Sequence, residues 1–215
     1  MSKILILGGN GYAGSHIARE AASRGHATVS LSRSAPAQAL AGVQYEQGSA
    51  AHLATLEHLL DGVDVVVGAL SPFGDLAGQY VPIYRAALAP IAKAEARFVV
   101  IGGFSGLRPA PGAERFIDSG QVPPEYYTGA RETADALEML LADAPQELDW
   151  LFVSPAAQFG AFAPGERTGQ YRKSADVALF DAAGHSAIGG ADFALAVVDE
   201  IEQPSVHRGQ ISFAY

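Results

Sequence analysis

A glycine-rich stretch near the N-terminus is the part of the sequence best suited to chemistry. It reads Gly8-Gly9-Asn10-Gly11-Tyr12-Ala13-Gly14 and fits both G-x-G-x-x-G and G-x-x-G-x-x-G spacing. Glycine adopts positive φ freely and has no side chain, so backbone N–H groups can approach an anion closely. A helix that starts here would add free donors and a partial positive charge. We therefore expect these seven residues to bind the diphosphate of a dinucleotide.

The flanking sequence supports this interpretation. The apolar run 4–7 predicts a buried strand directly before the glycines, residues 14–23 predict a helix, and residues 27–32 predict a second strand. A strand, a glycine turn and a helix in this order are the context in which the motif becomes specific. The alternative is a tight turn that binds nothing.

The end of the second predicted strand bears on which dinucleotide binds. An NAD site carries Asp or Glu there for the ribose 2′-hydroxyl, whereas an arginine accommodates a 2′-phosphate. The sequence has Ser32-Arg33-Ser34 and no acid. The guanidinium fork of Arg33 suits a phosphate, and the two serines add hydroxyl donors. We expect NADP(H) to be preferred, with NAD(H) also accepted; the alternative is a solvated surface arginine.

The remaining pattern predicts the elements that position these residues. Further strands are expected at 43–47, 64–70, 98–101, 150–153 and 210–215, and helices at 52–60, 80–96, 125–142 and 191–202, with Pro90 kinking or splitting the second of these. Such alternation predicts an α/β fold, a Rossmann-type doubly wound parallel sheet with helices on both faces. We expect one domain, 1–215, in which 154–215 form a substrate-side extension.

Ligands of such sheets bind beyond the carboxyl ends of the strands. There we expect Ala69 and Leu70 beside the adenosine ribose, and Gly102, Pro155 and Ala156 near the nicotinamide. The long loop 102–124 has the length of a lid or binding loop.

Aromatic residues on the same loops suit a flat substrate. Phe73, Phe104, Tyr126 and Phe159 are the candidates, although each could simply cover the end of the sheet. Two arginines of the last third are also notable. Arg172 is a candidate for an anionic substrate, and Arg167 is expected to tether its loop through Glu166 or a nearby acid.

Composition excludes several classes of protein. Hydrophobic residues make up 49% of the 215 residues, too many for a disordered chain. The net charge of −9 argues against nucleic acid or an anionic membrane as partner. Cysteine is absent, which excludes a thiol nucleophile, and the histidines are poorly spaced for a metal site. The N-terminal apolar run is too short for a secretion signal, so we expect a cytoplasmic protein.

The sequence resembles the atypical short-chain dehydrogenase/reductases, and within them the NADH-flavin reductase and NAD(P)-binding (NmrA-like) family. The resemblance covers nearly the whole chain and includes the glycine turn, Gly102-Gly103, Ser154-Pro155-Ala156 and the specific segment Pro164-Gly165-Glu166-Arg167-Thr168-Gly169-Gln170-Tyr171-Arg172. The mammalian flavin reductase, biliverdin reductase B, is similar in plan. The resemblance implies NAD(P)H binding and hydride transfer to flavins or related conjugated acceptors.

One departure from that superfamily affects the reaction. Its Tyr-x-x-x-Lys pair appears here as Tyr127-Thr128-Gly129-Ala130-Arg131, with arginine in place of lysine. The resemblance makes Tyr127 and Ser105 the catalytic candidates, Ser105 as a donor to the acceptor oxygen. Packing at the mouth of the site for Tyr127, and a turn hydroxyl for Ser105, are the alternatives.

The missing pair favours acceptors that need no immediate proton. A ketone becomes an alkoxide that requires an acid at once, whereas a flavin or quinone spreads the charge over its rings. We expect an NADPH-preferring reductase of such acceptors, with the flavin as substrate rather than prosthetic group. The main alternative is a redox sensor that binds NADP(H) without turnover; an epimerase or dehydratase would need the absent pair. A homodimer through the last strand and the helix 125–142 stays open.

Overall fold

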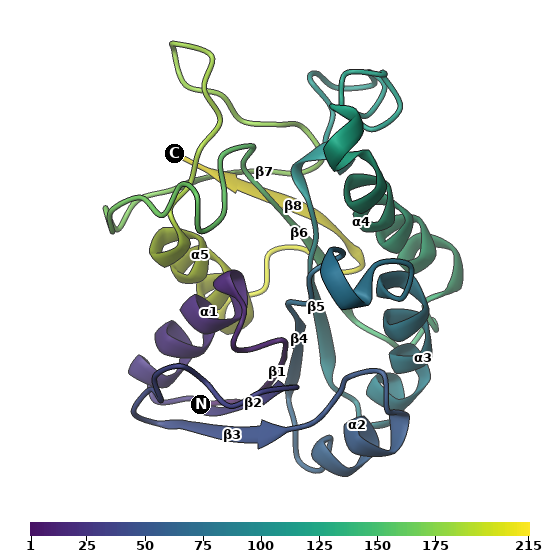
Figure 1. The fold of residues 1–215 in the computed structure, drawn as a ribbon, viewed down its shortest axis with the longest axis vertical. Coiled ribbons are helices and arrows are strands. Elements are labelled where there is room, and N and C mark those ends of the chain that lie inside the picture. The colour runs from purple at the N-terminus through teal and green to yellow at the C-terminus, as the bar shows by residue number, and fades with distance from the viewer.

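All residues from Met1 to Tyr215 are described by the computed structural model, in which eight strands form a single sheet between two layers of helices (Figure 1). The strands are β1 (Lys3–Leu7), β2 (Ala27–Ser32), β3 (Val43–Gln47), β4 (Val65–Gly68), β5 (Arg97–Ile101), β6 (Trp150–Pro155), β7 (Arg172–Ser174) and β8 (Gly209–Ala214). The helices are α1 (Tyr12–Ser23), α2 (Leu53–Leu59), α3 (Tyr80–Lys93), α4 (Pro124–Asp143) and α5 (Gly190–Glu202), with 3₁₀ turns η1 (Gly74–Leu76) and η2 (Phe104–Gly106).

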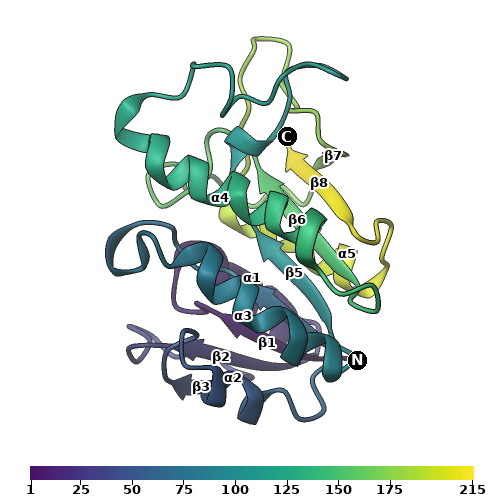
Figure 2. The ribbon, with the colours of Figure 1, turned by 90° about the vertical axis from the view of Figure 1, so that its right-hand side faces the viewer.

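The alternation of apolar residues along the central strands creates two cores. In β1, Ile4 and Ile6 join one core, whereas Leu5 and Leu7 join the other, and all four are fully buried. Helices α1 and α5 pack against each other over the first face, while α2, α3 and α4 cover the second (Figures 1 and 2). A strand buried on both faces needs apolar residues at every position, which is why a continuous run encodes it.

The order of the strands creates a crevice at the centre of the sheet. It is β3-β2-β1-β4-β5-β6-β8-β7, and every neighbouring pair is parallel except β7 and β8. Strands β2 and β3 therefore add to one side of β1, and the chain then crosses back so that β4 pairs with the other side of β1. The crevice at such a reversal is where open α/β sheets bind ligands. The predicted Rossmann-type fold is confirmed.

Two local features add to the sequence-based expectation. Of the two outcomes expected at Pro90, a kink or a split, the split does not occur, because helix α3 continues through Pro90 although proline removes a helical donor. The carbonyl left without that donor belongs to Ala86, an exposed residue, so water can satisfy it. Strand β7 was not predicted, because its sequence Arg-Lys-Ser has no apolar residue; it pairs with β8 at the edge of the sheet.

No helix of the chain is both long and apolar enough to cross a membrane.

Candidate functional site

A cavity of about 590 Å³ opens at the carboxyl ends of the central parallel strands. Residues that follow β1, β2, β4 and β5 line it, as the strand order requires. Many of the predicted cofactor residues are among them, namely Gly8, Asn10, Gly11, Tyr12, Ala13, Ser32, Arg33, Ser34, Ala69, Leu70 and Gly102. The glycine turn, the end of β2 and the residues that follow β4 are therefore parts of one cavity wall.

The glycine turn has the close packing that its sequence predicts. Gly8 adopts a φ of +86°, and a Cβ on it would lie 2.7 Å from the carbonyl oxygen of Ala69. A Cβ on Gly14 would lie 2.3 Å from the carbonyl oxygen of Gly8, so this glycine allows α1 to sit directly on the turn. Gly9 and Gly14 do not line the cavity because they form the packed back of the turn.

The start of α1 provides donors for an anion. Gly11 is the N-cap and carries no side chain that could cap the helix, so the first N–H groups of α1 lack a partner of that kind. The turn is braced against β2, since the Asn10 N–H donates to Ser32 Oγ at 3.0 Å and Asn10 Nδ2 donates to the Ser34 carbonyl at 2.6 Å. A rigid turn with free helical donors fits the diphosphate of a dinucleotide.

Arg33 lies at the end of β2, on the wall of the cavity. It is the only lysine or arginine among the lining residues. Its Nη1 donates to Asp75 Oδ2 at 2.9 Å, and its backbone carbonyl accepts a hydrogen bond from Gln47 Nε2. About half of the Arg33 side chain is exposed, so its remaining donors stay accessible.

Comparison with known proteins agrees with this geometry. The model of a family described as NAD(P)H-binding matches residues 8–204, which includes both the glycine turn and α5. The chain belongs to the NAD(P)H-binding family. Its ligand is therefore a nicotinamide dinucleotide.

Three solved structures are similar to this NAD(P)H-binding protein over its whole length. A Streptococcus pneumoniae protein provisionally named an NADH-flavin reductase has a TM-score of 0.89 and 28% identity, with 99% of its own chain covered. A Bacteroides thetaiotaomicron protein provisionally named an epimerase has a TM-score of 0.87 and 30% identity, with 97% of its chain covered. A Burkholderia pseudomallei protein provisionally named an exported protein has a TM-score of 0.87 and 38% identity, with full coverage of both chains.

Aromatic and small residues from the segments after β4 and β6 and from α4 also line the cavity. Phe73, Phe159, Gly160 and Thr133 line it, and the ring of Tyr12 meets that of Phe159 edge-on at 5.2 Å. Phe73 and Phe159 are thus the two predicted substrate residues that the structure brings to the cavity. Aromatic rings on a cavity wall suit an aromatic ligand.

Apart from Arg33, the titratable side chains of the cavity wall are Tyr12 and Tyr80, and both have hydrogen-bond partners within the protein. The hydroxyl of Tyr12 accepts a hydrogen bond from the Gly190 N–H at 3.0 Å and lies 3.3 Å from the carbonyl of Pro164. Tyr80 is fully buried and donates to the carbonyl of Ile101 at 2.8 Å. Burial raises the pKa of Tyr80 well above its ordinary value, so its proton is held.

The two catalytic candidates do not line the cavity. Tyr127 is exposed on the first turns of α4, and Ser105 lies in η2. Arg131, which replaces the lysine of the superfamily pair, forms ion pairs with Asp118, Asp135 and Glu138. Its guanidinium therefore ties α4 to the preceding loop. The catalytic roles of Tyr127 and Ser105 stay predictions.

Other predicted residues also lie outside the lining of the cavity. These are Pro155, Ala156, Phe104, Tyr126 and Arg172. The ring of Phe104 stacks on that of Phe116 at 4.8 Å, and Tyr126 is exposed on α4. Arg172 donates to the carbonyls of Tyr215 and Phe180, so it holds the end of the chain against the loop before α5.

The segment 164–172 that carries the family resemblance is bound to the helices of the first face. Arg167 forms two hydrogen bonds with the buried Glu20 of α1, at 2.6 and 3.2 Å. The predicted tether is present, and its acid is Glu20 rather than Glu166. The hydrogen bonds from Arg167, and a further one from Arg24, hold the pKa of Glu20 below its ordinary value despite burial.

A second buried acid holds the same segment. Asp192, in the first turn of α5, accepts hydrogen bonds from the N–H and hydroxyl of Thr168, the N–H of Gly169 and the hydroxyl of Tyr215. Burial alone would raise the pKa of Asp192, but these donors lower it below its ordinary value. The two acids therefore anchor the segment to α1 and α5.

Some residues of the cavity wall were not predicted. They include the segment 48–51 after β3, Leu76 of η1, Tyr80 of α3 and Thr133 of α4. The segment after β3 could have been found from the rule that places ligands at carboxyl ends, since β3 neighbours β2. Thr133 lies on a helix face whose direction only the packing of α4 reveals.

Proposed function

We propose that this protein is an NADPH-preferring reductase that passes hydride to a small, flat, conjugated acceptor such as a flavin or a quinone. The observation that carries the proposal is the make-up of the cavity wall. It combines an anion-binding turn and Arg33 with an aromatic surface, and the two tyrosines on it already have hydrogen-bond partners.

The residues of the chain divide the work of binding. The N–H groups at the start of α1 hold the diphosphate, and Arg33 holds the 2′-phosphate that distinguishes NADPH from NADH. NADPH supplies the hydride when bound. Phe73 and Phe159 offer faces against which an aromatic acceptor stacks, which positions it for the transfer.

The nature of the acceptor follows from proton supply. Reduction of a simple ketone requires an acid beside the developing alkoxide. Tyr80 holds its proton in a buried hydrogen bond, and the hydroxyl of Tyr12 is engaged by Gly190 and Pro164. A flavin or quinone spreads the added charge and takes its proton from solvent, so it needs no such acid. The provisional name of the Streptococcus pneumoniae structure agrees with this choice.

Binding and turnover test the two parts of the proposal separately. Replacement of Arg33 by methionine should weaken NADPH binding about 10- to 100-fold and leave NADH binding unchanged, because a hydrogen bond to a charged group contributes about 1.5–3 kcal/mol. Calorimetry with both nucleotides measures this. An equal loss for both nucleotides would remove Arg33 from its role.

Turnover is followed as NADPH oxidation with riboflavin, FMN and a benzoquinone, alongside a panel of simple ketones. We expect oxidation with the conjugated acceptors and none with the ketones. Tight NADPH binding without turnover by any acceptor would instead identify a binding protein that senses the cofactor.

A further inference from the structure

The segment between β4 and α3, residues 71–78, forms one wall of the cavity. We refer to it as the strap. Ser71, Pro72, Phe73 and Leu76 of the strap line the cavity directly. It contains the 3₁₀ turn η1, and it crosses from the end of β4 towards the start of α3 (Figure 1).

The strap is fixed firmly on the side of α4. The ring of Phe73 packs against Gly129, where an added Cβ would lie 2.3 Å from the ring. The Gly78 N–H donates to Glu132 Oε1 at 2.6 Å. These two contacts, one apolar and one charge-assisted, join the strap to α4 at both of its ends.

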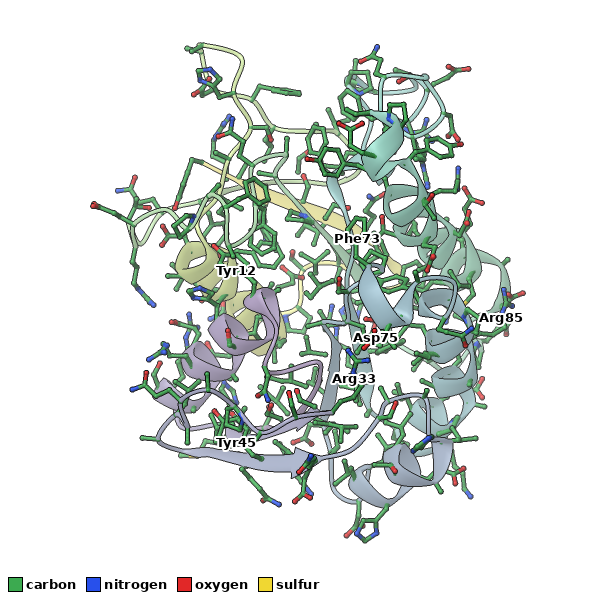
Figure 3. The ribbon with its side chains drawn as sticks, in the orientation of Figure 1. Tyr12, Arg33, Tyr45, Phe73, Asp75 and Arg85 are labelled. Carbon is green, nitrogen blue, oxygen red and sulfur yellow. The ribbon has the colours of Figure 1, made fainter.

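On the side of β2 the strap is held by an ion pair. Asp75 Oδ2 accepts from Arg33 Nη1 at 2.9 Å, and Figure 3 shows the two side chains directed towards each other from the strap and from the end of β2. The side chain of Asp75 is 84% exposed and that of Arg33 is 54% exposed. Asp75 lies in η1, which is closed by a hydrogen bond from the Ala77 N–H to the Gly74 carbonyl, and Gly74 and Gly78 on either side of it adopt positive φ.

We propose that Asp75 is a specificity-determining residue that lowers the preference for NADPH by competing with its 2′-phosphate for Arg33. This inference rests on the proposed function, because it assigns Arg33 to that phosphate. Arg33 is the only cationic side chain of the cavity wall, so no second cation can take over either partner.

The competition affects the two cofactors differently. A phosphate monoester carries nearly two negative charges and draws the guanidinium away from the carboxylate. The 2′-hydroxyl of NADH is uncharged and leaves the Arg33–Asp75 pair in place. Only NADPH therefore loses binding energy to the separation of this pair.

The size of the effect follows from the exposure of the pair. An exposed ion pair changes an equilibrium by at most about fivefold. Replacement of Asp75 by asparagine removes the negative charge while keeping the shape. It should therefore tighten NADP⁺ binding by about two- to fivefold and leave NAD⁺ binding unchanged.

Calorimetric titration of NADP⁺ and NAD⁺ at low ionic strength is the direct test. Asp143→Asn is the matched control, since Asp143 also pairs with an arginine, Arg85, but neither residue lines the cavity. This control removes the same charge, so a general electrostatic effect would appear in both variants. We expect the ratio of the NAD⁺ and NADP⁺ dissociation constants to rise in Asp75→Asn alone.

Hydrogen exchange in the free protein gives a second readout that needs no nucleotide. Backbone amides of residues 74–78 should exchange faster in Asp75→Asn than in the parent, whereas Asp143→Asn should leave them unchanged. Identical exchange in all three proteins would show that the pair does not hold the strap, and would overturn the inference.

The binding measurements distinguish a failure of the role of Asp75 from a failure of the proposed function. An unchanged ratio in Asp75→Asn, with both nucleotides bound by the parent, overturns the role of Asp75 alone. Failure of the parent to bind either nucleotide overturns the proposed function, and this inference with it.

Discussion

Replacement of Gly14 by alanine tests whether the turn and α1 pack as closely as described. The added Cβ would lie 2.3 Å from the carbonyl oxygen of Gly8 and 2.8 Å from Cα of Gly9, and both are backbone atoms that cannot rotate away. Overpacking of this kind costs up to about 3 kcal/mol. Alanine in place of glycine within a helix returns at most about 1 kcal/mol. We expect a net loss of stability of about 2 kcal/mol.

Thermal unfolding followed by the fluorescence of the single tryptophan measures this loss. Trp150 is buried in β6, so its emission reports exposure of the core. A change of 1 kcal/mol shifts Tm by about 2–4 °C in a domain of this size, so Tm should fall by about 4–8 °C.

Gly11→Ala is the control, because its Cβ would meet Gly8 no closer than 3.2 Å and Gly11 has an ordinary extended φ of −72°. It should lower Tm by less than about 3 °C. Helix propensity alone predicts a stabilised Gly14→Ala protein. A Tm equal to or above that of the parent would therefore refute the packing argument.

Two further variants test the buried acids that hold segment 164–172. Asp192→Asn should cost about 2–3 kcal/mol at pH 7, because it weakens hydrogen bonds to a charged acceptor. Folding lowers the pKa of Asp192, so its carboxylate contributes fully to the free energy of unfolding above about pH 4. This contribution is lost as the pH falls through the lower pKa of the native state. Chemical denaturation between pH 7 and pH 2 should therefore show the free energies of unfolding of the two proteins converging. Arg167→Met should lower the free energy of unfolding by about 1–2 kcal/mol. The loss is smaller than for a buried carboxylate left without any partner, because Glu20 keeps its ion pair with Arg24. Faster chymotrypsin cleavage after Tyr171 would accompany it, and an unchanged cleavage rate would contradict the tether.

The parts of the fold that were predicted correctly are those that local sequence encodes. The run 4–7 is apolar at every position because β1 is buried on both faces, and such a run has few other interpretations. Strand β7 forms only because β8 offers it an edge to pair with, so its three polar residues carry no local signal.

The residues of the site likewise divide into those indicated by local sequence and those placed by tertiary packing. The places of the glycine turn and Arg33 on the cavity wall were predicted because each directly follows a strand that the sequence indicates; their roles in binding stay predictions. The position of Thr133 on the cavity wall depends on how α4 packs, which the sequence does not state. The partners of Arg131 are a different case, because Asp135 and Glu138 lie four and seven residues further along the same helix; their helical spacing carried a signal for the contact that was not used.

Tyr12 has a consequence for attempts to recombine this protein with its relatives. It belongs to the glycine turn, yet its hydroxyl is bonded to Gly190 and lies 3.3 Å from the carbonyl of Pro164, more than 150 residues away in the chain. The N-terminal glycine turn and the C-terminal segment that carries Pro164 and Gly190 are consequently not interchangeable modules. A chimera that imports a new C-terminal segment would also have to import the matching residue at position 12, together with the acids at 20 and 192 that hold segment 164–172.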